Sequence, residues 1–85
     1  MKLRLATGEE GEATAIDGNL LTLLSPRAFA PGAPIRFSTV DFEEERSFEG
    51  RTLGSKRVED GRFEVRMRFV NLRREDRELL LQELP

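Results

Sequence analysis

The chain has 85 residues, of which 38% are hydrophobic and 35% charged, and a net charge of −2; this composition supports one folded core but not two. It contains no cysteine and no histidine, which excludes disulfides, thiolate metal sites and the usual Ser-His and Cys-His nucleophile pairs. We therefore expect one domain over residues 1–85 that is not an enzyme and holds no metal or other resident cofactor. No apolar run reaches the length of a signal peptide or a membrane span, so we expect a cytoplasmic location without membrane insertion.

The N-terminal part of the chain predicts a strand and a hairpin. Over residues 2–5, lysine and arginine alternate with leucine, which is typical of a half-buried strand. Two apolar-rich segments, residues 12–16 and 20–24, flank the sequence Asp-Gly-Asn at 17–19. The central positions of tight hairpin turns need positive φ, which aspartate and glycine tolerate. An Asp-Gly pair between two such segments therefore predicts a hairpin.

The middle of the chain predicts a loop, a strand and a turn. Residues 25–34 hold three of the four prolines, and a central strand does not lose so many hydrogen-bond donors, so we expect a loop. Residues 35–39 alternate as a strand, and an acidic cluster follows at Asp41 and residues 43–45. The cluster lacks the ligand spacing of a calcium loop, which favours a solvated turn over a cation site.

The C-terminal part predicts two long strands and a helix. A strand is expected over residues 46–58, where Gly50 and Gly54 indicate a bulge or bend. Residues 63–69 show the clearest alternation in the chain, with apolar and charged side chains on opposite faces. A helix is then expected from about Asn71, taken as its N-cap, with apolar side chains at Leu72, Leu79, Leu80 and Leu84.

Together these elements predict a mainly β fold, a small antiparallel barrel of five or six strands with a C-terminal α-helix over one open end. The order of elements from Gly11 to Leu84 resembles a PilZ domain, and the similarity is greatest over residues 48–53 and 64–69. The resemblance implies a split-barrel fold. It also implies a regulatory adaptor in bacterial cyclic di-GMP signalling, with motility or surface polysaccharide as its output.

PilZ domains that bind cyclic di-GMP use an Arg-x-x-x-Arg stretch and an Asp-x-Ser-x-x-Gly turn. Arg4 has no arginine four residues away, so the first motif is absent. Asp17 matches the second motif, but Asn19 and Thr22 replace its serine and glycine. Each lost charge-assisted hydrogen bond costs about 1.5–3 kcal/mol. We therefore expect an adaptor that acts by protein contact without canonical nucleotide binding.

The candidate ligand-binding residues each have a second, structural interpretation. Asp17 and Asn19 are either the remnant of a ligand turn or simply the residues that a hairpin needs. Arg51, Arg66 and Arg68 either meet an anionic ligand or acidic partner on an outer barrel face, or form ordinary cross-strand pairs with glutamates. The first alternative function is a cyclic di-GMP receptor that uses these nonstandard arginines.

Candidate partner-binding residues are Phe29 and Phe42, which lie in an expected loop and at an expected turn. They either anchor a protein partner or fold back over the barrel ends. A second alternative function is a barrel that binds RNA or single-stranded DNA, but the basic residues at 56, 57 and 62 have no interleaved aromatic, so we expect no nucleic-acid partner. Exposed strand edges leave a homo-oligomer open.

Overall fold

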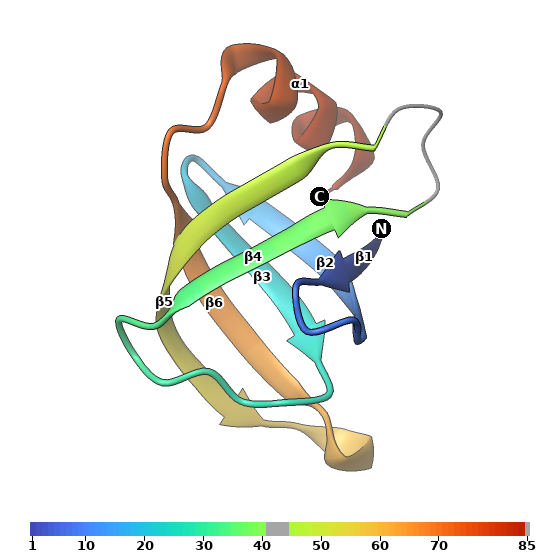
Figure 1. Cartoon of the computed structure of the whole chain (residues 1–85), viewed down its shortest axis with the longest axis vertical. Helices are drawn as coiled ribbons and strands as arrows, with labels where there is room; N and C mark the ends of the chain where they lie inside the picture. Colours follow the sequence, from blue (N-terminus) through green and yellow to red (C-terminus); the bar gives the residue numbers. More distant parts are fainter. Residues whose placement is uncertain (41–44, 85) are drawn as a thin grey trace.

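The computed structural model describes residues 1–40 and 45–84. The described residues form six strands, a 3₁₀ turn and one α-helix, namely β1 (Lys2–Leu5), β2 (Glu10–Asp17), β3 (Leu20–Ser25), β4 (Pro34–Thr39), β5 (Ser47–Arg57), η1 (Glu59–Gly61), β6 (Phe63–Phe69) and α1 (Arg74–Glu83). The strands close into an antiparallel barrel in the order β1-β2-β3-β6-β5-β4. The expected mainly β barrel with a C-terminal helix is confirmed, with six strands (Figure 1).

The β2–β3 hairpin has the predicted position, with Asp17 paired to Leu20 across a two-residue loop. Within this loop only Gly18 has a positive φ, of 61°. That pattern belongs to a type II′ turn, which needs glycine at its first central position. The hairpin prediction is confirmed, although Asp17 lies at the end of the strand and Gly18-Asn19 forms the turn.

The two glycines within β5 have different structural roles. The register between β5 and β6 shifts between Thr52 and Gly54, so Leu53 is the extra residue of a β-bulge. Gly50 instead lies on the inner face, where a Cβ would collide with the Met67 side chain and lie 2.5 Å from the Arg68 carbonyl oxygen. Close packing of β5 on β6 therefore requires glycine at position 50, and the bulge bends the strand at position 54.

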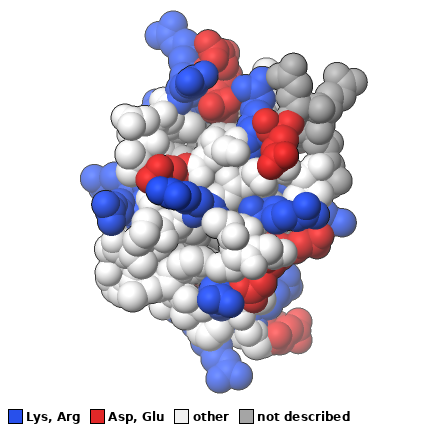
Figure 2. Space-filling model, viewed as in Figure 1, with Lys and Arg blue, Asp and Glu red and all other residues white. Residues whose placement is uncertain are grey.

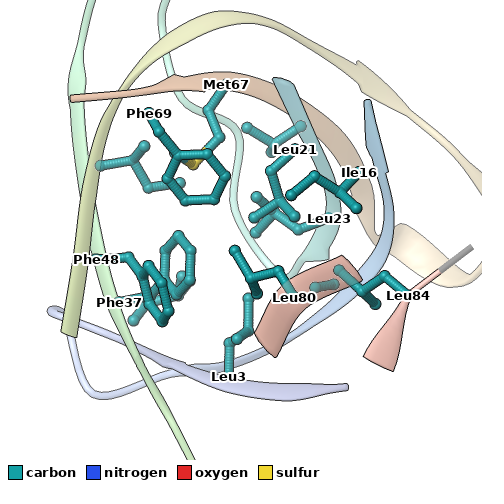
Figure 3. Close-up of a cluster of buried hydrophobic side chains, with 14 residues drawn as sticks. Leu3, Ile16, Leu21, Leu23, Phe37, Phe48, Met67, Phe69, Leu80 and Leu84 are labelled. Atoms are coloured by element: carbon teal, nitrogen blue, oxygen red, sulfur yellow. The ribbon is translucent and has the colours of Figure 1, made fainter. Parts of the chain in front are cut away.

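The core fills the barrel with alternate side chains of every strand. Its buried members are Leu3, Leu5, Ala13, Ile16, Leu21, Leu23, Ile35, Phe37, Phe48, Val65, Met67, Phe69, Leu80 and Leu84. Phe37 and Phe48 stack with ring centroids 5.3 Å apart, and Phe69 tilts against both. Figure 3 shows this aromatic group across the barrel from the leucines of β3, with the helix side chains entering from α1.

Helix α1 covers one end of the barrel (Figure 1) and buries Leu80, while Leu84 just beyond its end is also buried. The predicted N-cap is wrong: α1 begins after Arg73, and Asn71 adopts a left-handed conformation with φ of 55°. Asp76 on the first turn of α1 forms an ion pair with Arg46, with 2.6 Å between Arg46 Nη1 and Asp76 Oδ1. Apolar burial and polar contacts thus hold the helix, and this ion pair joins it to the segment before β5. In the part of the chain that the structure describes, no helix is long and apolar enough to cross a membrane.

Candidate functional site

The three candidate arginines lie on one outer face of the barrel. Arg66 and Arg68 point outward from β6 because the intervening residues of that strand are buried in the core. In the sheet register Arg68 lies opposite Arg51 of β5 on one side and opposite Leu20 of β3 on the other. Leu20 is in turn opposite Asp17 of β2, so a single cross-strand row brings four strands together. We call the exposed surface formed by Arg51, Arg66 and Arg68 the arginine face.

The arginine face departs from the charge pairing found elsewhere on the barrel. Arg36 lies opposite Glu49 with 3.7 Å between their charged groups, and Lys56 lies opposite Glu64 at 3.8 Å. These two pairs follow the ordinary structural interpretation of alternating charges. On the arginine face, by contrast, two arginines are direct cross-strand neighbours, and no carboxylate of the described residues lies within 4.0 Å of any of its guanidinium nitrogens.

Like charges directly opposite one another in a sheet are destabilising, by roughly 0.2–1 kcal/mol. The opposition of Arg51 and Arg68 therefore lowers the free energy of unfolding, and a glutamate at one of these two positions would recover that loss. The only hydrogen bond given by its side chains in the described part of the chain runs 3.2 Å from Arg51 Nη1 to the Gly32 carbonyl oxygen. The guanidinium groups of Arg66 and Arg68 consequently point into solvent with their donors available for an anionic partner.

An apolar feature adjoins the arginine face at the β5 bulge. Leu53 is 43% exposed, which is unusual for a large apolar side chain in this barrel. With Gly54, Lys56, Glu64 and Arg66 it lines a shallow hollow of about 370 Å³. Arginines and an exposed leucine therefore share one surface.

The turn residues have unequal roles in this surface. The side-chain oxygen of Asn19 accepts a hydrogen bond from the Arg77 guanidinium. The main-chain carbonyl oxygen of Asn19 accepts one from the Phe69 backbone amide at 2.9 Å. Asn19 thus ties the hairpin to α1 and to β6, as a structural residue does, whereas Asp17 is exposed. Sequence reasoning missed Arg77, because the contact joins residues 58 positions apart and no local pattern signals it.

Of the two candidate aromatic anchors, Phe29 lies in the described part of the chain and is not exposed. Phe29 is half-buried and packs against the core, and its backbone amide and carbonyl both bond to the Ser55 hydroxyl, at 3.0 and 2.8 Å. This geometry favours the interpretation in which the ring folds over the barrel. Phe42 lies outside the described residues, as do Asp41, Glu43 and Glu44 of the acidic cluster.

A larger cavity, of about 450 Å³, lies away from the arginine face, between the starts of β5 and α1 and the strands β1 and β4. Three of its four charged lining residues are already paired: Arg36 with Glu49, and Asp76 with Arg46. Only Arg4 lacks an ion-pair partner among the described residues. The cavity therefore offers an anion less unpaired charge than the arginine face does.

The surface over β4 and β5 carries charges of both signs in alternation (Figure 2). No group of His, Cys, Asp or Glu among the described residues is arranged to hold a metal ion.

The chain matches no family model, and comparisons with curated proteins and with solved structures likewise give no match.

Proposed function

We propose that this protein is a non-catalytic regulatory adaptor of the PilZ kind, which binds an acidic protein partner through the arginine face. The observation that carries the proposal is the direct opposition of Arg51 and Arg68 across β5 and β6. A like-charge pair that lowers stability, on a barrel whose other directly opposed charged residues are of opposite sign, is explained by a partner that supplies carboxylates.

The chemistry of guanidinium groups suits this role. Each arginine presents several N–H donors in a planar fork that fits a carboxylate bidentately, and it is always charged. Opposite charges at a docking surface also speed encounter and suppress wrong partners. A small barrel closed by its own helix provides a rigid platform on which such groups stay in register.

A second candidate, a cyclic dinucleotide receptor with nonstandard residues, is favoured by the row that joins Asp17 to the arginine pair. Two features weigh against it. The Asn19 side chain is engaged by Arg77, and the five described phenylalanines are all buried or half-buried, which leaves no exposed ring for a base to stack on. The same lack of exposed rings in the described residues disfavours single-stranded nucleic acid.

Affinity capture followed by reconstitution tests the proposal. A partner captured by the wild-type chain is purified and titrated against wild type, the double variant Arg51→Gln/Arg68→Gln, and the control Arg4→Gln on β1. In barrel order β1 lies three strands from β6 and two from β5, so the control removes one exposed charge outside the arginine face. We expect the double variant to lose binding by about 10-fold or more, since each desolvated charged contact contributes over 1 kcal/mol.

Two results contradict the proposal. The first is equal binding of the partner by wild type and the double variant, which places docking elsewhere on the barrel. The second is calorimetric binding of cyclic di-GMP at micromolar affinity that the double variant loses, which identifies the arginine face as a nucleotide site. A gel-shift series with oligonucleotides at two salt concentrations distinguishes the nucleic-acid alternative, because phosphate contacts make affinity fall steeply with salt.

A further inference from the structure

We infer that the hollow beside the arginine face receives one apolar side chain of the partner, so that the docked segment is a short acidic stretch with an apolar anchor. This inference rests on the proposed function and specifies its partner. Its basis is the juxtaposition of the β5 bulge, the exposed Leu53 and the outward Arg66.

The bulge creates the hollow. Because Leu53 is the extra residue of the bulge, it has no cross-strand neighbour on β6 to cover it and remains 43% exposed. The following residue is Gly54, which lies opposite Arg66 and has no side chain to fill the space between the strands. A Cβ added at Gly54 meets nothing within 4 Å, so this part of the outer surface is open.

The chemistry of the walls selects the occupant. Leu53 gives one apolar wall, and the Lys56–Glu64 ion pair across the strands occupies the charges at the far side. The arginine at position 66 is left to attract a carboxylate, and the Arg51–Arg68 pair continues the same positive surface beyond it. The volume of the hollow, about 370 Å³, lies at the small end of the range for ligand sites, which is about 300–1,000 Å³.

An apolar anchor ringed by charged contacts is also the arrangement that concentrates binding energy in protein interfaces. A few well-packed residues carry most of the affinity, and arginines are over-represented among them. A uniformly acidic peptide would satisfy the guanidinium groups but leave Leu53 in water. A segment with a leucine or phenylalanine between acidic residues satisfies both features at once.

Gly54→Val tests the hollow without disturbing the charges. The backbone of Gly54 lies outside the left-handed region, and the added atoms have open space, so the variant is expected to fold. Ser47→Val is the matched control, since it adds the same side chain to an exposed position at the other end of β5. Gly54→Ala is a second, smaller filling variant.

The probes are two fluorescein-labelled 12-residue peptides, one with leucine between glutamates and one with serine in its place. Fluorescence anisotropy at low salt is expected to show that wild type prefers the leucine peptide by about 10-fold, the discrimination that a modest apolar pocket provides. Gly54→Val should abolish that preference while leaving the serine peptide's affinity unchanged. Ser47→Val should retain it.

The outcomes separate the inference from the function on which it rests. Equal binding of the two peptides by wild type, or a preference that survives in Gly54→Val, overturns the hollow while leaving the arginine face in place. If neither peptide binds, or if Arg51→Gln/Arg68→Gln binds both as wild type does, the acidic partner itself is wrong. Concentration-dependent sedimentation that Gly54→Val removes would assign the hollow to a second copy of this chain, which also overturns the inference.

Discussion

Arg68→Glu should stabilise this protein while impairing its binding. The substitution replaces a repulsive cross-strand pair with an attractive one between β5 and β6. Each such pair is worth roughly 0.2–1 kcal/mol relative to alanines, so the combined change is about 0.4–2 kcal/mol, toward the lower end for exposed groups. Asp17, the nearest carboxylate in the row, is two strands away, roughly 10 Å, so its repulsion of a glutamate at position 68 is weaker than the attraction of the directly opposite Arg51.

Thermal unfolding followed by circular dichroism measures the effect. For a domain of this size 1 kcal/mol shifts Tm by about 4–8 °C, so a rise of several degrees is expected at low salt and a smaller one at 1 M salt. Arg68→Gln, which only removes the repulsion, should give an intermediate rise.

Lys56→Glu is the opposite control, because it converts an existing 3.8 Å ion pair into a like-charge pair and should lower Tm. If Arg68→Glu lowers Tm at both salt concentrations, Arg68 contributes to folding through other contacts. That result would mean that the arginine face is maintained for folding and not for binding.

Three further substitutions test the packing that supports the site, each by urea unfolding. Thr52→Val should raise the free energy of unfolding by about 1 kcal/mol, because the buried Thr52 hydroxyl has no hydrogen-bond partner among the described residues; a loss would mean that water or another group satisfies it. Ser55→Ala should cost about 1–3 kcal/mol, since that hydroxyl both donates to and accepts from the Phe29 backbone; an unchanged midpoint would show that the proline-rich loop is held by other contacts. Gly50→Ala should cost about 1–3 kcal/mol by overpacking against Met67, whereas alanine at the bulge glycine should be nearly neutral; equal effects at the two glycines would contradict the assigned roles.

The strands were predictable where side-chain alternation alone decides the face. Over residues 63–69 every predicted inward residue from Val65 onward is buried, because a closed barrel with one buried face imposes a period of two. The Asp-Gly-Asn segment predicted the hairpin because tight turns select such residues, which is also a local property of the sequence. The spacing of the leucines predicted the helix, but it did not predict the residue at which the helix begins. Asn71 is suited both to an N-cap and to a left-handed turn, and the path of the chain from β6 to α1 required the turn.

The candidate site was predictable in composition but not in arrangement. Alternation places Arg66 and Arg68 outward, yet it does not reveal whether glutamates or arginines face them. That depends on the β5–β6 register, which the loop lengths and the bulge set together. Lys56 does pair with Glu64, but Arg51 lies opposite Arg68, so the expected cross-strand pairing with glutamates is not found for these two arginines among the described residues. The interpretation that the arginines meet an anionic ligand or an acidic partner stays a prediction.

The bulge connects the fold to the proposed binding surface. If β5 paired regularly with β6 and Leu53 did not bulge out, every residue of β5 beyond Thr52 would shift by one position along β6, and its side chain would move to the opposite face. Lys56 would lose its position opposite Glu64, and Ser55 would no longer reach the Phe29 backbone. The bulged register that opens the hollow is therefore also the register that places the Lys56–Glu64 ion pair on the outer surface and Ser55 beside the preceding loop. The proposed docking surface is therefore held in place by contacts on both faces of β5, the Lys56–Glu64 ion pair outside and the hydrogen bonds of Ser55 to the Phe29 backbone on the other side.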